Sequence, residues 1–569
     1  MHASACIVPI GNSDRALAGC IPRSPGREQH RRRARRTEHD ETQAETTGPT
    51  VSERSAPDTD SITVPGPDSL GAVAEAEAAD RAIDQHVVAA RPDHGARNTR
   101  VIWLLLAATF TVFLNETIMS VAIPELVDDL GVTLSAAQWL TTAFMLTMAV
   151  VIPITGFLLQ RFPTRPIFGA AMTLFSAGTL LAALAPGFEV LLGGRIIQAT
   201  GTAIMMPLLM TTLMTVVAPA DRGRFMGRVS IVMSVAPAIG PAISGLILNT
   251  LGWRYMFWLV LPIAVAMLVI GLRRVENISE TRVFPIDVFS VVLSAFGFGG
   301  LVYGLSLVGE VASGRAPGDA VPMWIALAVG ALGITAFIVR QVILQRGDRA
   351  LLDLRTFRSR NFAVSIGLMA VMMAALFGTI ILLPIYLQDV LGLEPLATGL
   401  LVLPGGLVMG LLGPTVGRLY DRVGPTPLLV PASIGVSAVL WSLTLVTQNT
   451  PPWMILAAHV VLSISLAFMF TPLFTTALGS VEPHLYSHGS AIVGTLQQVA
   501  GAAGTALFIT VMTATAAGAT AAGTEAIAAQ AAGVRNAFLV GAIVSLFAII
   551  GATLVRRPAD MPSGAPAAH

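Results

Sequence analysis

Beyond residue 100, long apolar runs alternate with short polar connections along nearly the whole chain. We count fourteen runs of roughly 20 residues, the length that an α-helix needs to cross the hydrocarbon core of a bilayer. The predicted spans are 101–122, 138–159, 166–186, 190–217, 225–249, 254–272, 286–309, 320–344, 361–387, 396–417, 427–447, 453–477, 488–513 and 534–555. The pattern therefore predicts an all-α polytopic membrane protein.

The placement of arginine tests this count independently. With the N-terminus inside, the even-numbered connections carry most of the arginines, whereas the opposite side holds only Arg254, Arg315 and Arg535. Such an excess of positive charge marks the cytoplasmic side of a membrane protein. We expect a multi-pass plasma-membrane protein with both termini in the cytoplasm. The loop after span twelve, with Glu482, His484 and His488, is the exception because it has no arginine.

The composition supports a membrane protein and argues against other classes of protein. Of 569 residues, 54% are hydrophobic and 12% are charged, about half the charge of an average soluble protein. All 35 basic residues are arginine, a bias that fits a bacterium with a GC-rich genome. Without lysine the chain has no conventional phosphate-binding loop, so it is not an ATP-driven pump on its own. No metal cluster or nucleophile constellation stands out, and we expect neither an enzyme, nor a cofactor, nor a nucleic-acid partner.

The polar ends of the chain differ in kind from its centre. Residues 1–100 combine dense charge with low hydrophobicity, which predicts a disordered tail. Both cysteines, Cys6 and Cys20, lie in this tail, so structural disulfides in the apolar body are excluded. Residues 558–569 form a second, short tail.

An internal repeat divides the apolar body. Gly156-Phe-Leu-Leu-Gln-Arg161 follows span two, and Gly417-Arg-Leu-Tyr-Asp-Arg422 follows span ten. Both copies share Gly-x-Leu-x-x-Arg, and paired halves of this kind are common in secondary transporters. We predict a six-helix bundle over 101–273, two inserted helices with a cytoplasmic loop over 274–359, and a second six-helix bundle over 360–557.

The fifth span carries a strip of small residues beside two prolines. Ala236, Gly240 and Ser244 recur every fourth residue and share one helix face. Pro237 and Pro241 each remove a backbone hydrogen bond, which lipid tolerates only where neighbouring helices cover the backbone. We therefore expect a distorted, closely packed helix. Ordinary packing of small residues in a membrane bundle is the competing interpretation.

Four motifs in order resemble the major facilitator superfamily, specifically its fourteen-helix drug:proton antiporter branch. Leu114-Asn-Glu-Thr-Ile-Met-Ser-Val-Ala-Ile-Pro124 is similar to the first-helix signature of that branch. The loop from Gly156 to Arg165 resembles the superfamily's cytoplasmic motif, with Gln160 in place of its aspartate. Arg195-Ile-Ile-Gln-Ala-Thr-Gly201 is similar to the fourth-helix motif. The fifth span looks like the antiporter motif, matched at Gly227, Gly240, Pro241 and Gly245, with Ala236 and Ser244 replacing two glycines.

The residues and the resemblance together name candidate sites. An ionisable side chain within a span is costly and usually functional, so Glu116 is the candidate proton carrier. The resemblance places the family's acid one position earlier, at Asn115, and implies that Arg195 assists proton transfer; a structural ion pair is the alternative for Arg195. We expect the substrate cavity to be lined by Asn115, Gln198, Met205, Met206 and Gln497. The resemblance implies cytoplasmic gating by Gly156, Arg161, Arg165, Gly417, Asp421 and Arg422, and sealing of the pathway by the antiporter motif with Pro237.

These expectations converge on a monomeric efflux transporter that exchanges protons for hydrophobic or amphipathic compounds by alternating access. An exporter dedicated to one metabolite or antibiotic is the nearest alternative. A membrane sensor or scaffold without transport is an alternative from another class, although it has no need for Glu116, Arg195 and paired half-repeats.

Overall fold

A computed structural model describes residues 94–119, 122–277, 285–312 and 320–558. Within these ranges, fourteen helices are long and apolar enough to cross a membrane, and no strand is present. The predicted all-α polytopic fold is therefore confirmed. The predicted tails 1–100 and 558–569 lie outside the described ranges, apart from residues 94–100 and residue 558.

The described helices follow the predicted spans closely. Their bounds are α2 (His94–Ile118), α4 (Leu134–Arg161), α5 (Thr164–Ala183), α6 (Phe188–Val216), α7 (Arg222–Thr250), α8 (Arg254–Arg274), α9 (Val288–Ser294), α10 (Gly300–Ala312), α11 (Val321–Leu344), α12 (Arg360–Ile385), α13 (Pro395–Val423), α14 (Thr426–Leu443), α15 (Pro452–Gly479), α16 (Tyr486–Ala521) and α17 (Ala526–Leu554). The short helix α3 (Ile123–Leu130) follows α2.

Helix regularity differs between the fifth and the seventh span. Helix α7 runs as one helix from Arg222 to Thr250, past Pro237 and Pro241, and the distortion expected from these prolines stays a prediction. The seventh span, in contrast, is interrupted: a π-helical stretch, Ala295–Gly299 (η3), joins α9 to α10. A π stretch re-aims side chains within a helix.

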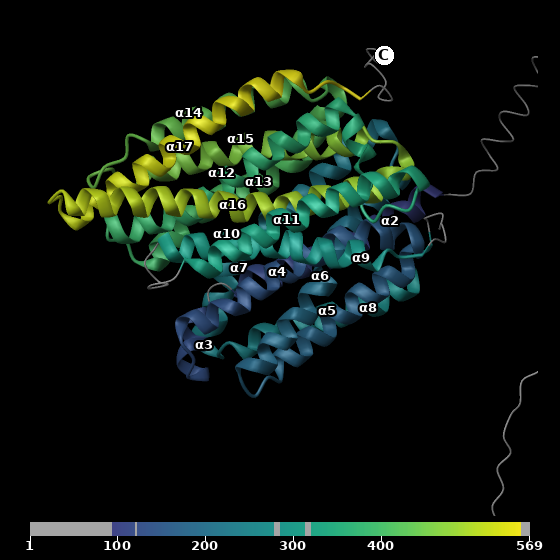
Figure 1. Ribbon diagram of the computed structural model, residues 1–569, viewed down its shortest axis with the longest axis horizontal. Helices are drawn as coiled ribbons and strands as arrows, with labels where there is room; N and C mark the ends of the chain where they lie inside the picture. Colours follow the sequence, from purple (N-terminus) through teal and green to yellow (C-terminus); the bar gives the residue numbers. More distant parts are fainter. Residues whose placement is uncertain (1–93, 120–121, 278–284, 313–319, 559–569) are drawn as a thin grey trace, which may run out of the picture. The chain divides into compact units, whose positions relative to one another are not determined.

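Packing groups the helices as the repeat predicts. In the first half, α5 contacts α6 and α8, and α2 contacts α6, α7 and α8. In the second half, α14 contacts α15 and α17, and α16 contacts α12 and α17. Figure 1 shows α5 beside α8, and α14 beside α17. We keep 101–273 and 360–557 as the predicted limits of the two halves.

The two halves meet through a symmetric pair of contacts. Helix α7 of the first half packs on α13 of the second, and α16 of the second half packs on α4 of the first. In the repeat, α4 corresponds to α13 and α7 to α16, so each contact is the counterpart of the other. The inserted helices α10 and α11 pack on each other, and α10 also contacts α4 and α16.

Candidate functional site

A carboxylate and a guanidinium are buried together inside the first half. Glu116 lies near the end of α2, and its Oε2 is buried without a hydrogen-bond partner. Arg195 lies on α6, is 1% exposed and is close enough to Glu116 for an electrostatic interaction. A buried polar atom without a partner is costly, which makes this pair a candidate site rather than ordinary packing.

Two neighbours hold the Arg195 guanidinium. It lies over the ring of Phe144 on α4, with 4.1 Å from Cζ to the ring centroid. Arg195 Nη1 donates to Gln198 Oε1 at 2.7 Å, and Gln198 Nε2 donates to Thr179 Oγ1 on α5 at 2.7 Å. Arg195 Nε is buried without a partner. The guanidinium is therefore only partly satisfied, which leaves capacity for a further acceptor.

Most of the predicted cavity residues are buried in this conformation. Gln198 and Met205 are 0% exposed, and Asn115 is 4% exposed with its Oδ1 lacking a partner. Met206 belongs to the main hydrophobic core, whereas Gln497 is half-buried. In this conformation the first four lie within the first half, and their assignment to the substrate cavity stays a prediction.

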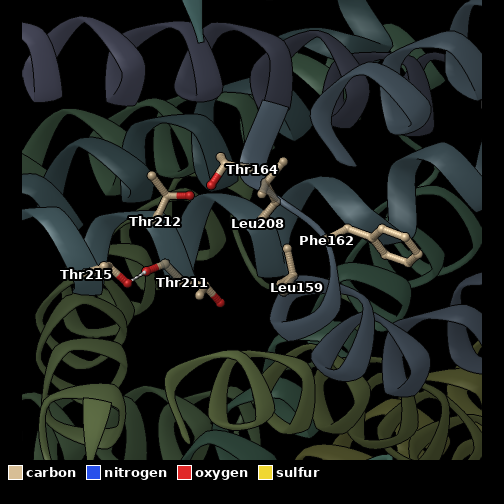
Figure 2. A pocket seen from close by; sticks show the side chains of 7 residues that line it. All are labelled: Leu159, Phe162, Thr164, Leu208, Thr211, Thr212 and Thr215. Atoms are coloured by element: carbon tan, nitrogen blue, oxygen red, sulfur yellow. Dashed lines mark hydrogen bonds between the residues drawn. The ribbon is translucent and has the colours of Figure 1, made fainter. Parts of the chain in front are cut away.

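A small pocket opens at the predicted cytoplasmic end of the first half. Figure 2 shows its lining, which consists of Leu159, Phe162, Thr164, Leu208, Thr211, Thr212 and Thr215. None of the predicted cavity residues is among them. Thr215 Oγ1 donates to the backbone oxygen of Thr211, whose hydroxyl lies 2.8 Å from Ser490 Oγ on α16. The pocket thus borders a contact between the halves.

Helix α7 presents its small residues on two opposite faces. The strip predicted from the sequence is buried: Ala236 and Ser244 are 0% exposed, and Ser244 Oγ donates to Met256 Sδ on α8. A Cβ added at Gly240 would lie 2.3 Å from Thr117 Oγ1 on α2. The strip therefore packs α7 against the helix that carries Glu116. Gly245 has no neighbour within 4 Å of an added Cβ, so close packing does not require this glycine.

Gly227 faces the other way, towards the second half. Nine residues separate it from Ala236, which turns the side chain by about 180° on an α-helix. A Cβ at Gly227 would lie 2.2 Å from the backbone oxygen of Gly413 on α13, and one at Gly417 would lie 2.1 Å from that of Gly223. The two helices thus touch backbone to backbone. The spacing of Gly406, Gly410, Gly413 and Gly417 was a visible signal of this contact.

Asp421 joins the halves at the end of this contact. Its two carboxylate oxygens accept hydrogen bonds from the backbone N–H groups of Gly223 and Arg224, both at 2.8 Å. These groups belong to the first turn of α7, where N–H groups lack intrahelical partners and negative charge is favoured. Arg422, the next residue, is exposed.

The first copy of the repeat makes a weaker contact at the corresponding place. Gln160 Nε2 donates to the backbone oxygen of His484 at 2.9 Å, just before α16. A Cβ at Gly156 would lie 3.2 Å from the His488 ring. Arg165 donates its backbone N–H to Asn277 in the connection after α8, and Arg161 lies 5.7 Å from the centroid of the Phe162 ring. Of the predicted gating residues, Gly156, Gly417 and Asp421 thus lie at the contacts between the halves. The predicted arginines lie beside these contacts.

Comparison with known proteins agrees with this geometry. The family model described as Major Facilitator Superfamily matches residues 105–505. The chain belongs to the major facilitator superfamily.

Its relatives in this superfamily include drug-resistance proteins. The chain is 37% identical to the lincomycin resistance protein LmrB of Bacillus subtilis (strain 168) over 459 residues, covering 80% of this chain and 95% of that protein. It is 28% identical to the multidrug resistance protein B homolog of Mycobacterium tuberculosis (strain ATCC 25618 / H37Rv), covering 75% and 80% of the two chains. The crystal structure of the human organic anion transporter MFSD10 matches with a TM-score of 0.57 at 15% identity, covering 81% of this chain and 99% of that chain, and shows the shared fold.

Proposed function

We propose that this member of the major facilitator superfamily exports hydrophobic or amphipathic drug-like compounds from a bacterial cell in exchange for protons. The observation that carries the proposal is Glu116, a carboxyl group inside a span that has an unpartnered oxygen and interacts electrostatically with the buried Arg195. An ionisable side chain inside the membrane is costly and usually functional. We therefore infer that Glu116 binds and releases a proton and is not a fixed ion pair. The relatives named for lincomycin and multidrug resistance support the class of substrate.

The contacts of Arg195 suggest how proton binding and release at Glu116 are tolerated. When Glu116 is ionised, the guanidinium is its nearest counter-charge. When Glu116 is protonated, the Phe144 ring and Gln198 still stabilise the arginine, since aromatic faces attract cations. In both protonation states of Glu116 the guanidinium then keeps a partner: the carboxylate when Glu116 is ionised, and the Phe144 ring and Gln198 when it is protonated.

Alternating access requires the halves to close one side of the membrane at a time. We assign closure of the predicted cytoplasmic side to the contact of α7 with α13 and its counterpart between α16 and α4. The closed contact is held by close backbone approach and by the Asp421 hydrogen bonds, which separate if the halves rock apart. A gate of this kind breaks a few short contacts at once and leaves each bundle intact.

Everted membrane vesicles with an acidic interior test the proposal. Lincomycin and an amphipathic dye such as ethidium are each added, and dissipation of the pH gradient is followed with wild type and Glu116→Gln. We expect wild type to dissipate the gradient on addition of substrate and Glu116→Gln to have lost this activity. Glu189→Gln is the matched control, because Glu189 is exposed at the start of α6.

The outcomes separate the alternatives. Substrate uptake that survives both Glu116→Gln and collapse of the gradient would overturn proton coupling. Response to a single compound among many would favour a dedicated exporter. Absence of any transport from vesicles that contain the folded protein would favour a sensor or scaffold.

A further inference from the structure

Two pairs of hydroxyl groups join the halves near the predicted cytoplasmic side. Thr211 Oγ1 on α6 lies 2.8 Å from Ser490 Oγ on α16. Ser230 Oγ on α7 lies 2.7 Å from Thr471 Oγ1 on α15. Each hydroxyl lies at most eight residues from the predicted cytoplasmic end of its helix. Each pair is thus a hydrogen bond between a helix of the first half and a helix of the second.

The two pairs are counterparts in the internal repeat. Thr211-Thr-Leu-Met-Thr215 on α6 and Thr471-Pro-Leu-Phe-Thr475 on α15 share Thr-x-Leu-x-Thr at an offset of 260 residues. Ser230 and Ser490 are separated by the same offset, which is one residue less than the offset between the two Gly-x-Leu-x-x-Arg motifs. Both halves therefore offer the same threonine and the same serine to each other.

The serine of each pair is also bound within its own helix. Ser490 Oγ donates to the backbone oxygen of Ser487 at 2.9 Å, nearer than the 3.4 Å to the Pro207 oxygen on α6. Ser230 Oγ donates to the backbone oxygen of Met226 at 3.2 Å. Since a serine hydroxyl has one proton, the threonine is the donor in both pairs. Removal of the threonine hydroxyl therefore breaks the bond between the halves and leaves each serine with an acceptor in its own helix.

The pairs connect helices that the glycine contact does not join. That contact and its counterpart bring α7 to α13 and α16 to α4, whereas the hydroxyl pairs bring α16 to α6 and α7 to α15. Ser490, Ser230 and Thr471 are 3%, 7% and 1% exposed, and Thr211 lines the small pocket in Figure 2. Helix α6 also carries Arg195. One pair therefore ties the helix of the candidate proton site directly to the second half.

Neutral hydroxyls suit a contact that opens and closes in every transport cycle. A buried hydroxyl is costly when it lacks a partner, and these four satisfy one another while the halves are closed. When the halves separate, each hydroxyl can bind water, and no charge has to be desolvated when they close again. We propose that Thr211 with Ser490 and Ser230 with Thr471 form a hydroxyl latch, which closes the predicted cytoplasmic side and breaks whenever that side opens. This inference rests on alternating access in the proposed function.

Distances measured between spin labels test the hydroxyl latch without any transport. In the full-length protein in lipid, Cys6→Ser and Cys20→Ser remove the native thiols. Labels at Arg274→Cys and Arg556→Cys, both exposed, report the separation of the two halves. A pair at Arg165→Cys and Arg274→Cys reports the first half alone and is expected to stay unchanged in every variant.

Valine in place of each threonine keeps the shape of the side chain and removes its hydroxyl. We expect Thr211→Val and Thr471→Val each to raise the ratio of separated to closed halves about fivefold, which corresponds to about 1 kcal/mol, the contribution of a neutral hydrogen bond. Because the two pairs share no atom, the double variant is expected to raise the ratio about 25-fold. Thr211→Ser with Thr471→Ser keeps both hydroxyls and is expected to match wild type.

Thr215→Val and Thr475→Val are the matched controls, one turn further along the same two helices. Their hydroxyls donate within their own helix, to the backbone oxygens of Thr211 at 2.8 Å and Thr471 at 2.7 Å, and their distances are expected to equal those of wild type. A similar increase in the controls, or an unchanged distribution in either Thr211→Val or Thr471→Val as folded protein, overturns the proposal. If one of these two does not fold, the fivefold increase is required of the other. Because distances are read without substrate or proton gradient, the hydroxyl latch can be established or rejected even if proton coupling fails.

Discussion

Replacing Gly417 by alanine is expected to open the contact between α7 and α13. The added Cβ would lie 2.1 Å from the backbone oxygen of Gly223, whereas ordinary contact begins near 3.4 Å. Since both atoms belong to helix backbones, no side-chain rotation relieves the overlap. The helices must separate here by about 1.3 Å, the difference between those two distances.

That separation also breaks the Asp421 lock one turn away. Its bonds to Gly223 and Arg224 are 2.8 Å long, and a shift of about 1 Å stretches both beyond hydrogen-bonding distance. Two bonds to a charged acceptor contribute about 3 kcal/mol together, and alanine returns about 0.5–1 kcal/mol by favouring the helix. The net change of about 2 kcal/mol corresponds to roughly a thirtyfold shift from closed to separated halves.

The assay measures the distance between spin labels at Arg274→Cys and Arg556→Cys, both exposed, after Cys6→Ser and Cys20→Ser have removed the native thiols. Gly399→Ala is the control in the same helix, because an added Cβ there has no neighbour within 4 Å, and its distribution is expected to match wild type. The reasoning is refuted if Gly417→Ala and Gly399→Ala give the same distances in folded protein. A loss of folding in Gly417→Ala alone would show instead that the contact stabilises the bundle and does not open.

Three further predictions follow from single contacts. Phe144→Leu removes the aromatic face below Arg195 and is expected to cost about 0.5–2 kcal/mol and to weaken substrate-driven proton release, measured in the vesicle assay. Thr179→Val leaves Gln198 Nε2 without its acceptor and is expected to lower stability by about 1–3 kcal/mol, measured by thermal unfolding in detergent, with the exposed Thr335→Val as control. Hydrogen bonds from Arg340 lower the pKa of Asp287 to about 2, so its contribution to stability is present above pH ~4 and is lost as the pH falls towards 2. Because the Arg340 side chain is 35% exposed, we expect at most about 2 kcal/mol from this pair, and Asp287→Asn is expected to flatten the acid limb of the unfolding curve between pH 4 and 2.

The sequence predicts the fourteen helices well because their signal is local. A span must hold about 20 apolar residues whatever it packs against, so hydropathy alone finds its limits. The span predicted at 427–447, for example, is α14 (Thr426–Leu443) in the structure. The small-residue strip on α7 was found for the same reason, since a spacing of four sets a helix face without knowledge of the neighbour.

The periodicity of the sequence does not predict which neighbouring helix each helix face contacts. Gly227 was read as part of one motif with Gly240, but they point to different halves, because α7 lies between α2 and α13. The bridge that Gln198 makes from Arg195 to Thr179 could not be predicted from spacing, because Thr179 lies on another helix. His488 was read as the residue where the loop after span twelve meets span thirteen, and its burial beside Gly156 was not predictable because Gly156 lies more than 300 residues earlier in the chain. Such contacts require the three-dimensional arrangement of the helices.

The two contacts between the halves should also differ in how mutations reach them. Asp421 binds backbone N–H groups of α7, so few side-chain replacements on α7 remove its partners, and only changes at Asp421 or at the glycine contact weaken it. The counterpart at Gln160 makes one uncharged hydrogen bond, to the backbone oxygen of His484, and therefore contributes less than the two charge-assisted bonds of Asp421. The pseudo-symmetric pair of contacts is thus unequal in strength, although both copies come from one repeat.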